Sequence, residues 1–307
     1  MGQQKKVILI AGPTASGKSK LAMKIAKFFK GEIINADSMQ IYKEISILNS
    51  KPSYKDRKTI RHHLYSFKPV KKKFSTGHWL KMTIKKIEKQ WKDQKLPIVV
   101  GGTGLYFKAL TDGLVNIPDI PDKFRKKIRT LHKKLGQKKF YDQLIKLDPL
   151  SQKHISSYDS QRSIRAYEVK KFTNKSLFDF IKQTKPIFEN KNFIKLFINT
   201  PKEILNNKIK NRVDYMFKKG AVKETKNFLK LKINKDLSPN KIIGISEIKD
   251  YLNGKTTLNE TKDLISQKTR QYAKRQFTWA RGHMKSWNMI YSSDLNDLFK
   301  KAINKIS

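Results

Sequence analysis

Short apolar runs alternate along this chain with longer stretches whose apolar residues recur at helical spacing. The runs are almost continuously apolar, as in strands buried on both faces, and comprise residues 7–11, 32–36, 97–100, 193–198 and 287–291. Helical patterns lie between them, for example over residues 20–30 and 76–95. This alternation predicts an α/β fold built on a doubly wound parallel sheet.

The alternation stops at the sequence Asn-Ile-Pro-Asp-Ile-Pro-Asp of residues 116–122, where two prolines in a polar stretch indicate a boundary. From there to about residue 190 the chain has only Lys-rich helical patterns, and an apolar run then resumes. We therefore expect an all-helical insertion over 119–190. Residues 1–118 and 191–307 would form the α/β core, with mainly helices over 201–283.

The composition adds a strong charge signal to this picture. Among 307 residues, 68 Lys and Arg outnumber 25 Asp and Glu, for a net charge of +43. Such an excess favours a polyanionic partner, most plausibly nucleic acid, although a chain rich in Lys, Asn and Ile also reflects an AT-rich genome.

The cysteine count and the lengths of the apolar runs bear on the compartment. The chain has no Cys, which excludes disulfides and thiolate metal sites and fits a reducing compartment. No apolar run reaches the ~20 residues of a membrane span. We expect a cytoplasmic monomer with no membrane attachment.

The first apolar run leads into the sequence Gly-Pro-Thr-Ala-Ser-Gly-Lys-Ser at residues 12–19, and a helical pattern follows. A strand, a glycine loop and a Lys-Ser pair that opens a helix are typical of a phosphate-binding loop. Backbone N–H groups and the positive end of the helix would face the anion. Lys18 would add a cation, and the Ser19 hydroxyl would bind Mg²⁺. The alternative is a turn that binds nothing.

Two other apolar runs end in residues with candidate chemistry. Asp37 follows the second run and Thr103 follows the third, in the sequence Gly-Gly-Thr-Gly. Parallel strands present ligands at their carboxyl ends, so both side chains should lie beside the glycine loop. Asp37 could act as a general base or could simply cap a helix. The glycines would let the backbone approach a ligand closely.

An acidic residue that often holds Mg²⁺ in phosphate-loop NTPases is missing at the expected places. Glycines follow the third apolar run, and Asn199 and Thr200 follow the fourth. The six histidines show no spacing typical of metal ligands. Ordinary phosphoryl transfer is therefore less favoured.

Two basic segments could contact nucleic acid. At residues 159–165, Asp159 or Ser160 can cap a helix on which Arg162 and Arg165 share a face. Near the C-terminus, a helix over 270–281 would place its basic residues on one face and Ala273, Phe277 and Ala280 on another; the basic face comprises Arg270, Lys274, Thr278 and Arg281. Basic residues interleaved with aromatic ones suit RNA, whereas the plainer interpretation is a solvated helix face.

Taken together, the motifs resemble one family, the tRNA dimethylallyltransferases, along nearly the whole chain. They are GPTASGKS (12–19), ADSMQIY (36–42), GGTGLY (101–106), QRSIRA (161–166), RVDYM (212–216) and KRQFTWAR (274–281), in the order that the family has them. The absence of Cys is similar to the bacterial form, since the eukaryotic enzymes add a zinc finger. Two segments differ from the family pattern: residues 47–52, which read ILNSKP near an expected IGTAKP, and residues 244–247, which read GISE near an expected GY-[RK]-E.

The resemblance implies transfer of a dimethylallyl group from dimethylallyl diphosphate to N6 of the adenosine adjacent to the anticodon of tRNA, with release of diphosphate. It implies catalytic roles for Asp37, Thr103 and Arg212, and Mg²⁺ at Ser19. The diphosphate-binding residues would be Gly12, Thr14, Ala15, Ser16, Gly17, Lys18 and Ser19. The tRNA-binding residues would be Asp37, Ser38, Met39, Gln40, Gln161, Arg162, Ser163, Ile164, Arg165, Lys274, Arg275, Gln276, Thr278, Trp279 and Arg281.

Two other functions remain open at this point. A phosphate-loop kinase of small molecules would explain the glycine loop and Asp37, but not the two basic segments. An RNA-binding protein with a degenerate nucleotide site would explain the basic segments, but not the intact loop.

Overall fold

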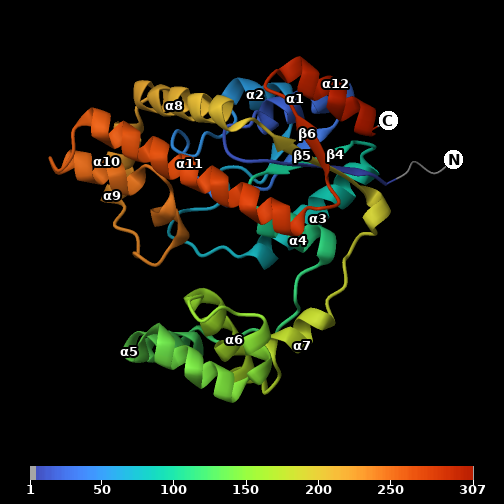
Figure 1. The fold of residues 1–307 in the computed structure, drawn as a ribbon. Helices are drawn as coiled ribbons and strands as arrows, with labels where there is room; N and C mark the ends of the chain where they lie inside the picture. Colours follow the sequence, from blue (N-terminus) through green and yellow to red (C-terminus); the bar gives the residue numbers. More distant parts are fainter. Residues whose placement is uncertain (1–4, 307) are drawn as a thin grey trace. The chain divides into compact units, whose positions relative to one another are not determined.

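The computed structural model describes residues 5–306, which form two compact units. One unit holds the chain up to Thr111 and from Phe188 onward, and the other holds Asp112–Ile187. Figure 1 shows the elements of each unit. The first unit carries the sheet, and the second is helical.

The first unit contains a parallel sheet of six strands in the order β3-β2-β4-β1-β5-β6. The strands are β1 (Val7–Ala11), β2 (Glu32–Asn35), β3 (His62–His63), β4 (Pro97–Gly101), β5 (Phe193–Asn199) and β6 (Asn288–Tyr291). The five predicted strands and the α/β class are confirmed. The two-residue strand β3 has no apolar pattern of its own; it adds to the sheet edge by pairing His62 with Ile33 and His63 with Ile34.

Helices cover both faces of this sheet, because alternate residues of each buried strand point to opposite sides. The helices of the first unit are α1 (Lys18–Phe28), α2 (Tyr54–Thr59), α3 (Thr76–Lys92), α4 (Gly104–Asp112), α8 (Lys202–Lys218), α9 (Ala221–Lys230), α10 (Ile245–Leu252), α11 (Leu258–His283) and α12 (Leu295–Ile306). Of these, α1 and α12 pack on one face of the sheet and α3 and α4 on the other. Short 3-10 turns occur at Asn190–Asn192 and Ser238–Lys241.

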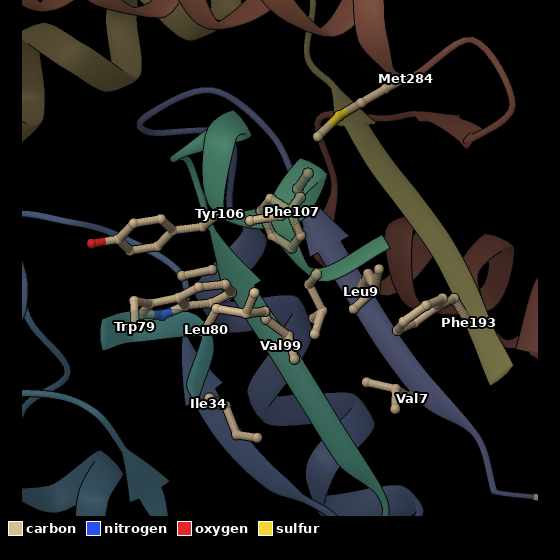
Figure 2. Packing of buried hydrophobic residues seen from close by; sticks show 14 of the residues in the cluster. Val7, Leu9, Ile34, Trp79, Leu80, Val99, Tyr106, Phe107, Phe193 and Met284 are labelled. Carbon is tan, nitrogen blue, oxygen red and sulfur yellow. The ribbon is translucent and has the colours of Figure 1, made fainter. Parts of the chain in front are cut away.

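Two apolar cores lie on the two sides of β1. Ile8 and Ile10 pack with buried residues of α1 and α12. Leu9, on the other side, packs with a cluster that includes Trp79 of α3 and Phe107 of α4. Figure 2 shows this second cluster from close by. The sheet is therefore anchored on both faces, which holds the loops at its carboxyl ends.

A third core lies among helices α8 to α11 and the chain that follows β2. It buries Ile41, Ile45 and Leu48 against residues such as Val213 of α8 and Ile248 of α10. This cluster fixes the segment that leads away from Asp37.

The second unit is built around α5 (Asp122–Leu147), α6 (Ser160–Thr173) and α7 (Leu177–Lys182), with a 3-10 turn at Pro149–Lys153. Its core joins Leu144, Ile155 and Ala166. Helix α5 contains a kink at Gly136, where φ is 73°. The Asp159 carboxylate caps α6 by accepting the Arg162 backbone N–H at 3.0 Å, as the sequence indicates.

Candidate active site

The glycine loop lies between β1 and α1, at the carboxyl end of the central strand. Gly17 has φ of 89°, a left-handed conformation that glycine adopts without steric cost, and Ala15 has φ of 65°. A Cβ atom at Gly12 would lie 2.9 Å from Ser16 Oγ and 3.1 Å from the carbonyl oxygen of Ile198. The loop therefore packs tightly against β5, and a larger residue would not fit in place of Gly12 without a shift of the loop.

The loop contains polar groups that the protein itself does not fully satisfy. The Ser16 Oγ atom is buried and has no hydrogen-bond partner among the described residues. The Lys18 ammonium donates to the Pro13 carbonyl oxygen at 3.1 Å. Burial lowers the pKa of Lys18 to about 8, and Asp37 opposes that shift. An anion seated here would supply the missing partners, because buried polar groups normally find one.

Asp37 follows β2 and is held in a local turn. Its Oδ1 atom accepts the Met39 backbone N–H at 2.9 Å, and its own N–H donates to Asn35 Oδ1 at 2.9 Å. The Asn35 amide is itself fixed, since its Nδ2 donates to the carbonyl oxygens of Asp37 and Leu64. No helix begins at Asp37, so its carboxylate is oriented by an Asx turn rather than used as a helix cap.

Thr103 lies beside this turn, on the loop between β4 and α4. Its Oγ1 atom accepts the Ser38 backbone N–H at 3.0 Å, and its backbone N–H donates to the Ala36 carbonyl oxygen at 3.1 Å. The ends of β2 and β4 are thus joined at the position that the strand order demands.

Arg212 of α8 completes the group of charges. Its Nε atom is buried without a hydrogen-bond partner among the described residues. Burial lowers the pKa of Arg212, and the Asp37 carboxylate opposes this effect. Asp37 opposes the lowering of the Lys18 pKa by burial in the same way, so one carboxylate lies within electrostatic reach of two cations.

Three tyrosines lie within electrostatic reach of the same carboxylate. Burial raises the pKa of Tyr65, Tyr106 and Tyr272, and the charge of Asp37 raises each further. They come from three separate parts of the first unit, and no sequence pattern indicates that they share a site with Asp37. Asp37, Lys18 and Arg212 thus form a charge cluster of one negative and two positive groups, which act on one another at a lower effective dielectric constant than in water.

The residues at 38–40 and the unusual segment after them support the Asp37 turn. Gln40 Nε2 donates to the Asn49 carbonyl oxygen at 2.8 Å, and Asn49 Nδ2 donates back to the Met39 carbonyl oxygen at 2.8 Å. The Glu224 carboxylate accepts the backbone N–H groups of residues 46–48. In this chain Asn49, where the family pattern differs, therefore ties the loop directly to Met39.

The second departure from the family pattern also has a local structure. Gly244 has φ of 108°, and a Cβ atom there would lie 2.7 Å from Leu48. The Glu247 carboxylate accepts the Gly244 N–H at 2.7 Å and forms an ion pair with Lys268. Hydrogen bonds to Lys268 and to this turn hold the pKa of Glu247 low against the opposing effect of burial.

The basic segment near the C-terminus forms part of α11. As the helical pattern predicts, Ala273 and Ala280 are buried, and the residues of the other face are exposed: Arg270, Lys274, Thr278 and Arg281. Arg275 is exposed as well. Gln276 and Trp279 instead face the two strand-end loops, where Gln276 hydrogen-bonds to Thr14 and Gly102.

The basic segment at 161–165 lies on α6, in the second unit. Gln161 and Arg162 are exposed, and Ile164 is half-buried. Ser163 is buried and donates its hydroxyl hydrogen to the Asp159 carbonyl oxygen at 2.7 Å. Arg165 pairs with the buried carboxylate of Glu168, at 3.5 Å.

Two further arginines that sequence reasoning missed gather around Glu168. Arg125 and Arg129 of α5 lie 3.3 and 3.7 Å from its carboxylate oxygens. Their spacing of four residues on a helix was the one available signal. One buried carboxylate thus holds three guanidinium groups, which leaves a net positive surface.

A metal site cannot rest on protein groups alone here. Over residues 5–306 there is no group of three His, Cys, Asp or Glu side chains suited to a metal ion. Mg²⁺ often keeps several waters and binds one or two protein groups together with phosphate oxygens. The exposed Ser19 side chain at the start of α1 fits such a partial site.

Among the helices of residues 5–306, none combines the length and the apolar composition that a membrane span requires.

Comparison with known proteins gives consistent matches. The family model described as IPP transferase matches residues 40–283. A tRNA dimethylallyltransferase of Pelagibacter ubique (strain HTCC1062) is 56% identical over 301 residues, which cover 98% of this chain and 96% of that protein. One from Rickettsia bellii (strain OSU 85-389) is 42% identical, over 99% and 96% of the two chains.

Solved structures agree with these matches. The tRNA isopentenylpyrophosphate transferase of Bacillus halodurans has a TM-score of 0.69 and 29% identity, over 98% of this chain and 97% of that one. A eukaryotic dimethylallyltransferase described as acting on tRNA has a TM-score of 0.84 and 28% identity, over 98% and 77%. The chain therefore belongs to the IPP transferase family.

Proposed function

We propose that this chain transfers a dimethylallyl group from dimethylallyl diphosphate to N6 of the adenosine adjacent to the anticodon in tRNA, releasing diphosphate. One observation carries the proposal: Asp37 lies within electrostatic reach of Lys18 and Arg212 at the carboxyl ends of the central strands. The relatives named above support the same reaction. In this reaction the carbon chain is transferred and the phosphate leaves.

The glycine loop fits the leaving group. An allylic diphosphate ionises readily because its cation is delocalised, so the main demand on the enzyme is to stabilise the departing charge. The Ser16 hydroxyl and the Arg212 Nε, both buried and unpartnered among the described residues, can donate to diphosphate oxygens. Lys18 adds a positive charge, and the N-terminus of α1 adds its dipole.

Asp37 fits the nucleophile side. An exocyclic amine conjugated to a purine is a poor nucleophile, so a carboxylate that accepts the N6 proton as the C–N bond forms is useful. The Asx turn and the hydrogen bond between Ser38 and Thr103 hold Asp37 in a fixed orientation. The adenosine has to leave its base stack to reach the Asp37 carboxylate.

We also propose Mg²⁺ as the cofactor, held by the Ser19 hydroxyl together with the diphosphate. Its chemistry would be additional neutralisation of the charge that develops on the leaving group. Lys18 and Arg212 supply the remaining positive charge from the protein.

The two basic segments fit the anticodon stem-loop. The exposed residues of α6 include an arginine, and those of α11 include arginines beside the aromatic Trp279. Arginine binds phosphate in a bidentate manner, and aromatic side chains stack on bases. Since tRNA is the acceptor, we propose the cytoplasm as the place of action. We propose a monomer as the working unit.

The test is mass spectrometry of tRNA nucleosides. Purified protein is incubated with Mg²⁺, dimethylallyl diphosphate and an unmodified tRNA whose anticodon is followed by adenosine. We expect one dimethylallyl group on each modified adenosine and one released diphosphate for each group transferred. Absence of transfer, together with ATP hydrolysis or phosphorylation of a metabolite, would instead favour a kinase.

A further inference from the structure

The side chain of Gln276 joins two loops that are far apart in the sequence. Its Oε1 atom accepts the Thr14 backbone N–H at 2.9 Å, and its Nε2 donates to the Gly102 carbonyl oxygen at 2.9 Å. Thr14 belongs to the glycine loop after β1, and Gly102 to the loop after β4. One amide group on α11 therefore spans both edges of the candidate active site.

The glycines of the second loop make room for this contact. A Cβ atom at Gly102 would lie 2.2 Å from Gln276 Nε2, and one at Gly104 would lie 2.2 Å from the Trp279 ring. The sequence suggested that these glycines allow a ligand to approach. In the structure the atoms that approach them belong to α11.

The helix that carries Gln276 is itself fixed against the core. Ala273 and Ala280 are buried on the same side, and the Phe277 ring lies 5.9 Å from that of Phe197 on β5. The position of the Gln276 amide is therefore determined by packing. A residue that positions other groups has to be held in place in this way.

The glycine loop needs such an external support. Ala15 adopts a positive φ of 65°, which a non-glycine residue rarely does, and the Ser16 hydroxyl lacks a partner among the described residues. The adjacent Thr14 N–H is held by Gln276 rather than by the loop.

We propose that Gln276 is a positioning residue for the diphosphate site: it sets the separation between the glycine loop and the Thr103 loop, rather than contacting RNA. This inference rests on the proposed function for the identity of the ligand. It differs from the role that the family resemblance suggests for Gln276, which is tRNA binding.

The test compares Gln276→Met with native protein. Methionine has a similar length but can neither accept from Thr14 nor donate to Gly102. We expect the affinity for inorganic diphosphate, measured by calorimetry, to fall about 5- to 20-fold, as the loss of two hydrogen bonds implies. KM for dimethylallyl diphosphate should rise in parallel, while the Kd of the anticodon stem-loop stays within about twofold.

Two further variants separate this role from a general loss of structure. Gly102→Ala would place a Cβ atom 2.2 Å from Gln276 Nε2. It should therefore displace the amide without removing it, and should reproduce the weaker diphosphate binding. Gln271→Met changes an exposed glutamine on the same helix and should match native protein. Melting temperatures of all variants are measured alongside.

The outcomes are distinct. Weaker stem-loop binding by Gln276→Met with unchanged diphosphate affinity would make Gln276 an RNA contact and overturn the inference. Unchanged binding of both would overturn it as well. If native protein binds diphosphate but transfers no prenyl group, the proposed function fails, while the inference is still decided by the diphosphate affinities.

Discussion

The charge cluster of the first unit (Asp37, Lys18 and Arg212) and the basic surface of the second unit use charge in opposite ways. In the cluster the charged groups are partly or wholly buried, and Asp37 shifts the pKa of both cations and of three tyrosines. On α5 and α6 the arginines are 35% to 68% exposed, and only Glu168 among their partners is fully buried. Interactions between buried charges are strong and depend on position, whereas each interaction of an exposed charge is weak and only their sum is large.

This contrast predicts that a single substitution in the charge cluster around Asp37 affects chemistry far more than one on the helical surface.

Asp37→Asn should have the largest effect. The substitution keeps the Oδ1 acceptor that holds the Met39 N–H but removes the base, so kcat should fall by about 10²- to 10⁴-fold. The Kd of the anticodon stem-loop should change by less than about twofold. Single-turnover transfer and a binding titration measure the two quantities.

Asp93→Asn is the control, since Asp93 is an exposed partner of Lys89 and should leave kcat unchanged. An equal loss of kcat and of RNA affinity in Asp37→Asn would make Asp37 a binding residue and would weaken the contrast drawn above.

Glu168→Gln tests the buried carboxylate of the helical unit that pairs with arginines. Replacing this carboxylate leaves Arg125, Arg129 and Arg165 facing each other without their shared anion. We expect the amides of α6 to lose about 2 kcal/mol of protection against hydrogen exchange, less than for a fully buried pair because the arginines are partly exposed.

Glu189→Gln serves as its control, since the Glu189–Lys191 pair is more than 70% exposed on both sides. If both variants exchange like native protein, Glu168 does not organise the arginines.

The pH dependence of diphosphate binding tests Lys18. Burial lowers its pKa to about 8 in the free protein, so the ammonium group loses its proton as the pH rises through that value. Diphosphate affinity should therefore fall about tenfold between pH 7 and pH 9. Lys18→Arg should bind diphosphate less tightly but without this fall, because a guanidinium stays charged.

The same shift has a defined effect on stability. The folded-state pKa lies below the value of 10.5 for an unperturbed lysine, so between about pH 8 and 10.5 the unfolded chain binds more protons. The contribution of Lys18 to the free energy of unfolding should thus increase with pH over that window. A decrease over this window in native protein relative to Lys18→Met would place the Lys18 pKa elsewhere.

The sequence predicted the parts of the site that follow from local patterns. The glycine loop, Asp37 and Thr103 each come directly after a buried strand, so the rule for parallel sheets places them together. Arg212 follows no such rule: from the sequence it could reach a diphosphate, but without the family resemblance it is predicted to be an ordinary surface arginine. The short strand β3 escaped detection because two residues carry no periodicity, and its pairing with β2 depends on the fold.

The contacts of Gln276, the three tyrosines near Asp37 and the arginines around Glu168 were also missed. Each depends on elements that meet only after folding; Thr14 and Gln276, for example, are 262 residues apart. A residue type at a strand end reveals itself in the sequence, whereas a contact between distant elements does not.

Replacing Arg162 and Arg165 by Ala should have the smallest effect per residue. Both lie on α6 with partly exposed guanidinium groups, so each can neutralise about one phosphate. We expect stem-loop affinity at moderate salt to fall only about fivefold, with kcat at saturating RNA unchanged. The slope of log K against log salt should become shallower by about 1.5.

The matched control is the double variant Lys127→Ala with Lys171→Ala, which removes the same charge from exposed positions of α5 and α6. Its salt slope should stay nearer the native value, because Lys171 lies on the face of α6 opposite Arg162. Equal slopes in the two double variants would mean that RNA responds to the net charge of +43 rather than to a defined face. The surface of the helical unit would then attract RNA without specificity, and the position of a charge would matter in the charge cluster around Asp37 but not on that surface.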